Sequence, residues 1–428
     1  MTSHRHNRPG RRSVLFRVAL LGVLALGVLP ASVAGFAPSS GRPERIPSTL
    51  AMYVPGGALA TQVTAHDNAF WAGAQRIDLR GINIQPTWDG EFPADADFAR
   101  IASWGMNFVR LQVRWAFIEP IPPVQVGSNW AHTYSTTYIE DLRQMVGYAY
   151  NHGINVLIDN AGKPGPSETD DWWPQWLYLP PYNSHGKTYV DMDEANTDYW
   201  TDQLQKRFTK DFMTYLADQL STSPGIVGYE MLNEPARGNL PNTHETTQTM
   251  LDVSLSIAQG VRYADPPRVV FFMTRGCCGE GLPMADLSGF TDLGNVSLDI
   301  HDYFGGRWGA GLMMDPAAPD YGEVLQQVDR FTLSTGPYLG TTTVQTQIIS
   351  NYRRFLDPLG IPLLVGEFSG DPPDEQNTAG LMGSMTAAFN DQDVAWTLYG
   401  YTGRFGILQP DGTLQPWAQI VIDAANAP

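Results

Sequence analysis

The sequence predicts an α/β fold, a (β/α)8 TIM barrel built as a single domain. Two observations support it: short apolar, strand-like runs alternate with amphipathic helical patterns, and eight such runs occur. The expected strands are residues 77–85, 107–114, 155–160, 226–233, 268–274, 296–301, 362–367 and 394–401. In such a barrel, functional side chains lie at the carboxyl ends of the strands.

Helical patterns fill the intervals between these strands. One of them places Ile139, Leu142, Met145, Val146 and Ala149 on one face, with the spacing of an amphipathic helix. The chain has 428 residues, of which 43% are hydrophobic and 17% charged. This composition predicts one large buried core rather than a disordered chain.

The net charge and the cysteine content limit which molecules and metal ions the protein is expected to bind. The formal net charge of -17 argues against binding to nucleic acid or anionic lipid, because both require clustered Lys and Arg. A neutral partner such as a carbohydrate is compatible with it. The two cysteines, Cys277 and Cys278, are adjacent, so they predict neither a disulfide framework nor a zinc-thiolate site. The histidine spacings and the strand ends contain no metal, phosphate-loop or dinucleotide motif, so no metal or cofactor is expected.

The first residues are typical of a targeting segment. Five arginines precede or begin the apolar stretch 18–33, which ends in small residues, so residues 1–34 are expected to be a signal peptide and the mature protein to be secreted or extracytoplasmic. The pair Arg11-Arg12 makes a twin-arginine signal an option. A membrane anchor is the alternative, but the stretch is shorter than the ~20 residues of a spanning helix and contains Pro30.

We expect residues 35–70 to form a linker and N-terminal extension and residues 71–428 to form the catalytic domain, as a monomer. Two stretches, 161–196 and 302–340, are too long for ordinary connections, so both are expected at the rim of a cleft. The first of them is rich in aromatic residues. The tryptophans expected to act as stacking platforms for sugar rings are Trp88, Trp115, Trp172, Trp173 and Trp176; ordinary core packing is the alternative for each.

Two glutamates carry the strongest chemical signal. Glu234 follows Asn233 after the fourth expected strand, and Glu367 ends the seventh. Unpaired buried carboxylates are costly, so a pair at the strand ends of a barrel favours a catalytic role over a structural one. Retaining glycoside hydrolysis needs such a pair, one carboxylic acid and one nucleophilic carboxylate.

Four motifs give the sequence its resemblance to a known family. They are Leu79-Arg80-Gly81-Ile82-Asn83, Gly105 to Leu111, Asn233-Glu234-Pro235 and Gly366-Glu367-Phe368. In this order and spacing the chain resembles glycoside hydrolase family 5, the cellulase family of retaining (β/α)8-barrel glycosidases, from about residue 77 to residue 401.

The resemblance implies a role for each matching residue. Glu234 corresponds to the acid/base and Glu367 to the nucleophile. Asn233 is expected to hydrogen-bond the sugar 2-hydroxyl and Arg110 to hold Glu367 ionised. His301 and Tyr303 match the His-x-Tyr motif of the sixth strand, where the Tyr is oriented toward the nucleophile. Arg114, four residues past Arg110, is interpreted as structural.

Two positions depart from the family pattern. Asn160 stands where a His is expected after the third strand, and Tyr399 where the eighth strand usually presents a Trp. Both are interpreted as substrate contacts, so the departures concern specificity and leave the catalytic pair unchanged.

The sequence therefore predicts a secreted retaining β-glycoside hydrolase that cleaves a β-linked glucan or related glycan by double displacement. The alternatives are an enzyme of the same fold with other specificity, such as a mannanase, a glycolipid-cleaving glycosidase or a transglycosylase, and a catalytically silent carbohydrate-binding barrel.

Overall fold

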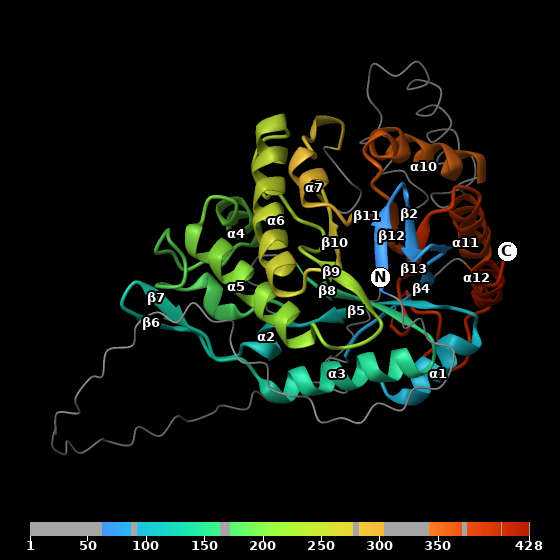
Figure 1. Cartoon of the computed structure of the whole chain (residues 1–428), viewed down its shortest axis with the longest axis horizontal. Helices are drawn as coiled ribbons and strands as arrows, with labels where there is room; N and C mark the ends of the chain where they lie inside the picture. Colours follow the sequence, from blue (N-terminus) through green and yellow to red (C-terminus); the bar gives the residue numbers. More distant parts are fainter. Residues whose placement is uncertain are drawn as a thin grey trace, which may run out of the picture. The chain divides into compact units, whose positions relative to one another are not determined.

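A computed structural model describes residues 62–86, 92–162, 172–276, 282–303, 342–369, 375–403 and 405–427. Its central feature is a closed barrel of parallel strands, shown in Figure 1. In chain order the strands are β4 (Arg80–Ile84), β5 (Phe108–Val113), β8 (Asn155–Asn160), β9 (Ile226–Glu230), β10 (Val269–Phe272), β11 (Val296–Tyr303), β12 (Leu363–Ser369) and β13 (Ala395–Leu398). Each pairs with its neighbour in the chain, and β13 closes on β4. The predicted (β/α)8 barrel is confirmed.

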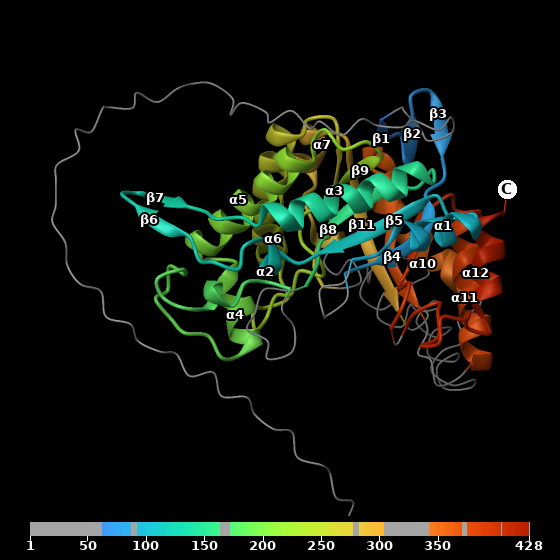
Figure 2. The same cartoon turned by 90° about the horizontal axis from the view of Figure 1, so that it is seen from below.

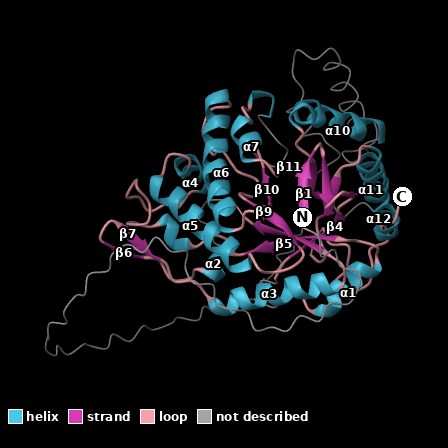
Figure 3. Ribbon diagram, in the orientation of Figure 1, coloured by secondary structure: helices cyan, strands magenta, loops and turns pink. Residues whose placement is uncertain are grey.

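Helices surround the strands (Figure 3). They are α1 (Asp95–Ser103), α2 (Trp115–Ile118), α3 (Thr136–Asn151), α4 (Met192–Tyr199), α5 (Gln203–Leu220), α6 (His244–Ala264), α7 (Ser288–Leu293), α10 (Thr342–Leu356), α11 (Glu375–Asp391) and α12 (Ala418–Ala425), with 3-10 turns at Gln175–Tyr178, Leu282–Met284 and Asp357–Leu359. The apolar face predicted for α3 is buried. None of the described helices is both long and apolar enough to cross a membrane.

The predicted strands are all present, but several end at different residues. β9 ends at Glu230, three residues earlier than expected, so Asn233 and Glu234 lie in the segment that follows it. Glu234 has a positive φ of 40°, which is uncommon for a non-glycine residue and incompatible with a continuing strand. β11 and β12 each extend two residues further than predicted.

An antiparallel sheet closes the amino end of the barrel. It consists of β1 (Val63–His66), β2 (Ala69–Ala72) and β3 (Gln75–Ile77), and Figure 2 shows it beside the barrel strands. Phe70 of β2 stacks on Phe271 of β10, with ring centroids 5.9 Å apart. The predicted boundary between extension and catalytic domain, residue 71, therefore falls inside β2. The preceding residues 1–61, and with them the predicted signal peptide, lie outside the described residues.

Two insertions follow the carboxyl ends of β5 and β8. The first contains a hairpin, β6 (Val124–Val126) with β7 (Asn129–Ala131), and projects from the barrel in Figure 2. The second contains α4 and packs against the hairpin: the rings of Trp130 in the hairpin and Tyr182 in the second insertion lie 5.8 Å apart. Trp88, the two cysteines and nearly all of the predicted rim stretch 302–340 lie outside the described residues.

Candidate active site

Strand alternation brings Arg110 to the centre of the barrel. On β5, Phe108 packs in the apolar layer that the capping sheet closes, and Arg110 comes two residues later on the same face. The guanidinium is fully buried. Its Nη1 donates to Oε1 of Glu367 at 2.7 Å, and its Nη2 donates to Oδ1 of Asn233 at 2.8 Å. Arg110 thus connects the segments that carry the two predicted catalytic glutamates.

Three further buried acids surround the same guanidinium. Asp159 of β8 lies 3.0 Å from Nη2, Glu230 of β9 lies 2.7 Å from Nε, and Asp299 of β11 lies 3.8 Å from Nε. Burial alone would lower the pKa of Arg110, but the surrounding carboxylates raise that pKa well above its usual value. Burial raises the pKa of both Asp159 and Asp299 well above their usual range, and Arg110 offsets this only in part. One cation faces several acids here, so these two hold protons more tightly than ordinary aspartates do.

A break in the register of β12 sets the position of Glu367. Ile300 pairs with Val365 and His301 pairs with Glu367, so Gly366 is left unmatched between them. A Cβ at residue 366 would lie 2.1 Å from Oδ2 of Asp299, and the N–H of Gly366 donates to Oδ1 of Asp299 at 2.7 Å. Only glycine allows this approach. The close contact with Asp299 therefore explains why residue 366, directly before Glu367, is a glycine.

The carboxylate of Glu367 accepts hydrogen bonds from three side chains. Arg110 donates to Oε1 at 2.7 Å, Tyr303 donates to Oε2 at 2.6 Å, and Gln112 donates to Oε1 at 3.3 Å. Burial and the charge of Glu367 raise the pKa of Tyr303 well above its usual value, so the phenol stays protonated and donates. Donors of this kind favour an ionised carboxylate with a fixed orientation.

Glu234 approaches the same point from the segment after β9. Its N–H donates to the sulfur of Met273 at 3.2 Å, and its Oε1 lies 2.8 Å from Nδ1 of His301. That nitrogen is also 3.4 Å from Oε2 of Glu367. One carboxylate oxygen of Glu234 and one of Glu367 lie within 4.8 Å of each other. The structure therefore brings together Glu234, Glu367 and His301, as the sequence predicted.

Tyr399 also reaches this site. It follows β13, and its ring centroid lies 6.3 Å from that of Tyr303. Burial and the nearby Glu367 raise the pKa of Tyr399, so its hydroxyl remains protonated. Asn83, Gln112 and Tyr399 line a recess beside Glu367.

Three predicted contacts are not placed at this recess. Asn160 is fully buried and exposes no side-chain atom. Because Asp159 points inward, strand alternation places Asn160 on the other face and makes Ala161 the next inward residue. Trp173 is 2% exposed and packs edge-on against Trp115 at 5.1 Å. Trp172 is 8% exposed and lies under the guanidinium of Arg114 at 4.7 Å. These aromatic residues pack in the core, so the sequence-based interpretation of Trp172 and Trp173 as open platforms is not supported.

Sequence reasoning missed several members of the site. They are Asn83, Gln112, Asp159, Glu230 and Asp299. The sequence did contain a signal that these side chains face the barrel interior, because each lies an even number of residues from an inward-facing neighbour in an expected strand. In addition, acids buried inside such strands are rarely found without a partner.

Two triads in the described part of the chain could bring metal-ligand atoms together: Glu230, Asp299 and His301, and Glu234, His301 and Glu367. In the first triad Glu230 already lies 2.7 Å from the cation of Arg110. In the second, Glu367 accepts hydrogen bonds from three donors. The carboxylates of both triads are therefore partly committed to protein partners.

Comparisons with known proteins bear on the family and on the fold. Residues 66–403 match the family model described as cellulase (glycosyl hydrolase family 5). A probable glucan 1,3-beta-glucosidase A of Neosartorya fischeri is 26% identical over 74% of this chain and 68% of its own length. Glucan 1,3-beta-glucosidase 1 of Schizosaccharomyces pombe is 29% identical over 34% of this chain, but the match spans only 30% of that protein.

Solved structures share the fold at low sequence identity. An endogalactoceramidase superposes with a TM-score of 0.62 at 18% identity, covering 85% of this chain and 84% of the other. Endoglucanase Cel5A of Thermotoga maritima superposes with a TM-score of 0.54 at 17% identity, covering 81% and 96%.

Proposed function

Because the chain belongs to glycosyl hydrolase family 5, we propose that it is a retaining β-glycosidase that cleaves a β-linked glucan by double displacement. Glu367 attacks the anomeric carbon, and Glu234 protonates the leaving oxygen and later activates water. One observation carries the proposal: carboxylate oxygens of the two residues lie within 4.8 Å. Both carboxylates also contact Nδ1 of His301, at 2.8 and 3.4 Å, and such a close approach supports the ~5–5.5 Å carboxyl separation of retaining enzymes rather than the ~6.5–9.5 Å separation of inverting ones.

The surrounding contacts support this division of roles. Glu367 accepts hydrogen bonds from Arg110 and Tyr303, which favour the anion that a nucleophile needs. Glu234 has His301 as its side-chain neighbour and lies beside the negative charge of Glu367, which favours a protonated acid. The amide oxygen of Asn233 is engaged by Arg110, so its NH2 group is the end available to a sugar hydroxyl.

β-1,3-Glucan is the first substrate to test, since the relatives identified by sequence are named for that linkage. We expect hydrolysis with retained anomeric configuration. Proton NMR of the first product measures this configuration. A 2-deoxy-2-fluoro glycoside should label Glu367, identified by mass spectrometry of peptides. Glu367→Gln should fold normally and lose activity by about 10⁴-fold or more. Inverted product, or wild-type activity in Glu367→Gln, would contradict the proposal.

A second candidate is a glycoside with an apolar aglycone, such as a glycolipid. The hairpin and the neighbouring insertion expose apolar side chains on the catalytic side of the barrel, among them Ile121, Val124 and Val126 at about 60% exposure and Val190 at 87%. A Val124→Ser, Val126→Ser double variant should lower activity on a glycolipid and leave activity on soluble glucan unchanged. Equal loss on both substrates would remove this candidate.

We also propose that the protein is exported with removal of residues 1–34. The arginine-rich start and the short apolar stretch support this. Amino-terminal sequencing of protein recovered outside the cytoplasm of a producing cell should begin near residue 35, whereas an intact amino terminus would contradict cleavage.

A further inference from the structure

Strand β12 contains one extra residue directly before the proposed nucleophile. On the β11 side, the pairing passes from Val365 to Glu367 while β11 advances by one residue. On the β13 side, it passes from Val365 to Phe368 while β13 advances by two. Both neighbouring strands therefore meet a bulge at the same place, and a bulge leaves its added residue outside the regular ladder. The residue left unmatched against β11 is Gly366, so its buried peptide groups depend on other partners.

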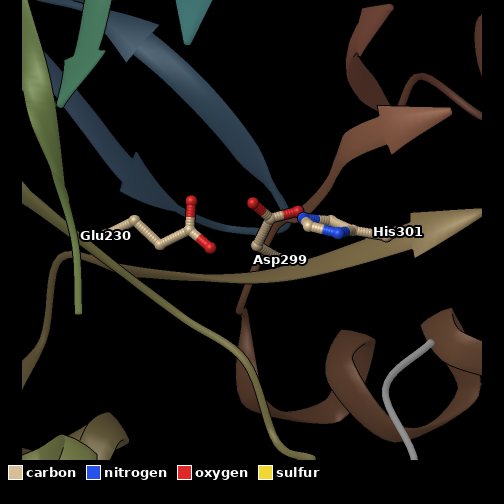
Figure 4. A group of neighbouring side chains, drawn as sticks. All are labelled: Glu230, Asp299 and His301. Carbon is tan, nitrogen blue, oxygen red and sulfur yellow. The ribbon is translucent and has the colours of Figure 1, made fainter. Parts of the chain in front are cut away.

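Side chains from three other strands bond to these peptide groups. The N–H of Gly366 donates to Oδ1 of Asp299 on β11 at 2.7 Å. Its C=O accepts from Nδ2 of Asn83 on β4 at 2.8 Å and from the hydroxyl of Thr397 on β13. All three side chains are buried, and Figure 4 shows Asp299 beside Glu230 and His301 inside the barrel. We call Asn83, Thr397 and Asp299 the Gly366 clamp.

Asn83 is the member of the clamp that also reaches the carboxylate of Glu367. It lies opposite Arg110 in the register of β4 and β5. Its Oδ1 accepts from Nη1 of Arg110 at 2.9 Å, and the same Nη1 donates to Oε1 of Glu367 at 2.7 Å. These hydrogen bonds form a closed ring that starts at the C=O of Gly366 and returns to the side chain of the next residue. One amide therefore holds both the main chain and the carboxylate of the nucleophile.

The chemistry of the partners fixes the orientation of the Asn83 amide. A guanidinium only donates and a carbonyl only accepts, so the amide oxygen faces Arg110 and the NH2 group faces Gly366. The NH2 group also has Oγ1 of Thr397 and the C=O of Leu398 within reach, each at 3.2 Å. Asn83 lines the recess beside Glu367, so a contact with the substrate is the alternative role. Because both ends of the amide are engaged inside the protein, positioning is favoured over substrate binding.

Resting on the proposed function, we propose that Asn83 is a positioning residue for the nucleophile: it fixes the Gly366 peptide and Nη1 of Arg110, and so places the carboxylate of Glu367 for attack. In that step, an oxygen of Glu367 bonds to C1, the C1–O bond breaks, and the leaving oxygen takes the bonding electron pair and the Glu234 proton. A misplacement of about 1 Å can lower the rate of such a step about 100-fold. Asn83 then acts on bond formation and has no role in binding the sugar.

Inactivation by a 2-deoxy-2-fluoro aryl glycoside measures this bond formation separately from later steps. In Asn83→Ala, the rate constant of inactivation, kinact, should fall about 100-fold, while the concentration for half-maximal inactivation, KI, should stay within about twofold. Asn107→Ala is the matched control. The Asn107 amide also joins the β4 and β5 segments through both ends, because it accepts from the N–H of Arg80 at 3.0 Å and donates to the C=O of Asp78 at 2.8 Å. It lies at the amino end of the barrel, so its loss should change kinact by less than about twofold, even where the unfolding temperature falls.

Three kinetic results would overturn the proposal. The first is an unchanged kinact in folded Asn83→Ala. The second is a KI that rises while kinact holds, as expected for a sugar contact. The third is an equal fall of kinact in Asn107→Ala, which would trace the effect to stability alone. If Asn83→Ala does not fold, Thr397→Val removes another donor to the same carbonyl with little change of shape. Its kinact should fall about 10-fold at constant KI, and an unchanged kinact there would also overturn the proposal.

Hydrogen exchange tests the clamp without a substrate, and so separates it from the proposed function. The N–H of Gly366 should exchange about 10-fold faster in Asn83→Ala than in the wild type, and at the wild-type rate in Asn107→Ala. Mass spectrometry of the peptide that covers residues 363–369 measures this. Equal rates in Asn83→Ala and the wild type would overturn the proposal even in an active enzyme. A wild-type protein that the glycoside does not label would contradict only the proposed function, and the exchange rates would still decide on the clamp.

Discussion

The two ends of the barrel are built from the same eight strands and have opposite chemistry. At the amino end, Phe108, Leu157, Phe271 and their neighbours form an apolar layer sealed by β1–β3. Two residues further along β5 and β8 the inward side chains are Arg110 and Asp159. Apolar burial stabilises the fold, whereas burial of several acids around one arginine costs free energy. The difference indicates that the sealed end maintains the scaffold and that the acidic end is retained for chemistry.

Of the three changes that compare the two ends with each other and with the periphery, the largest expected effect comes from a substitution at the acidic end that leaves the fold intact. Glu234→Gln keeps the shape of the side chain but cannot donate the acid proton, so kcat/KM on unactivated glucan should fall by about 10³–10⁴-fold. An activated aryl glycoside needs little protonation in the first step, so its glycosylation rate should fall far less. Stopped-flow and steady-state assays on both substrates, with unfolding midpoints as a control for folding, check this. Equal losses on the two substrates would argue against an acid role.

The next largest effect comes from a substitution in the apolar amino end of the barrel, away from the catalytic groups. Phe271→Ala removes a fully buried ring that stacks on Phe70 and should lower the free energy of unfolding by about 3–5 kcal/mol. Urea unfolding measures this, and kcat/KM of the folded protein should remain within about twofold. Phe355→Ala, at a half-buried residue of α10, serves as the control and should cost less. A large loss of activity in folded Phe271→Ala would mean that the two ends are not independent.

The smallest expected effect concerns a buried acid outside the barrel that has a titratable partner. Glu119 lies 2.6 Å from Nδ1 of His132, and Asp211 lies 3.6 Å from Nε2. Burial alone would lower the pKa of His132, but Asp211 and Glu119 raise that pKa from 6.5 to about 9. Because the folded-state pKa is raised, the stabilisation is fully present below about pH 6.5 and is lost as the pH rises through about 9.

His132→Gln should therefore lower the free energy of unfolding by about 1–2 kcal/mol at pH 6 and by much less at pH 10, after a discount for partial exposure and for the burial cost of Glu119. Denaturant unfolding at both pH values checks this. His152→Gln is the matched control, since His152 lies 3.0 Å from Asp95 at the surface, and it should change stability by less than about 0.5 kcal/mol. A loss for His132→Gln that does not depend on pH would remove the charge-based explanation.

Much of the site could be predicted because its signals are local in the chain. Asn233, Glu234 and Glu367 follow apolar runs, and the pair His301 and Tyr303 shares one face of a strand. Asp299 lies two residues before His301 on that same face, yet it was missed, because alternation alone does not say whether an inward acid meets a cation or a second acid. The tryptophans after β8 were placed at a cleft for a similar reason. A high density of aromatic residues predicts that they pack against a surface, but it does not distinguish a sugar ring from the protein core.

The sequence by itself determined the barrel, the number and order of its strands and the two glutamates, since hydrophobic periodicity and strand-end motifs depend only on neighbours along the chain. Only the tertiary structure decided that Gly366 makes room for Asp299, that Asn160 faces away from the site, and that one arginine is shared by acids from four strands. These are contacts between segments up to 257 residues apart. They follow from barrel closure and strand register, which no short stretch of sequence contains.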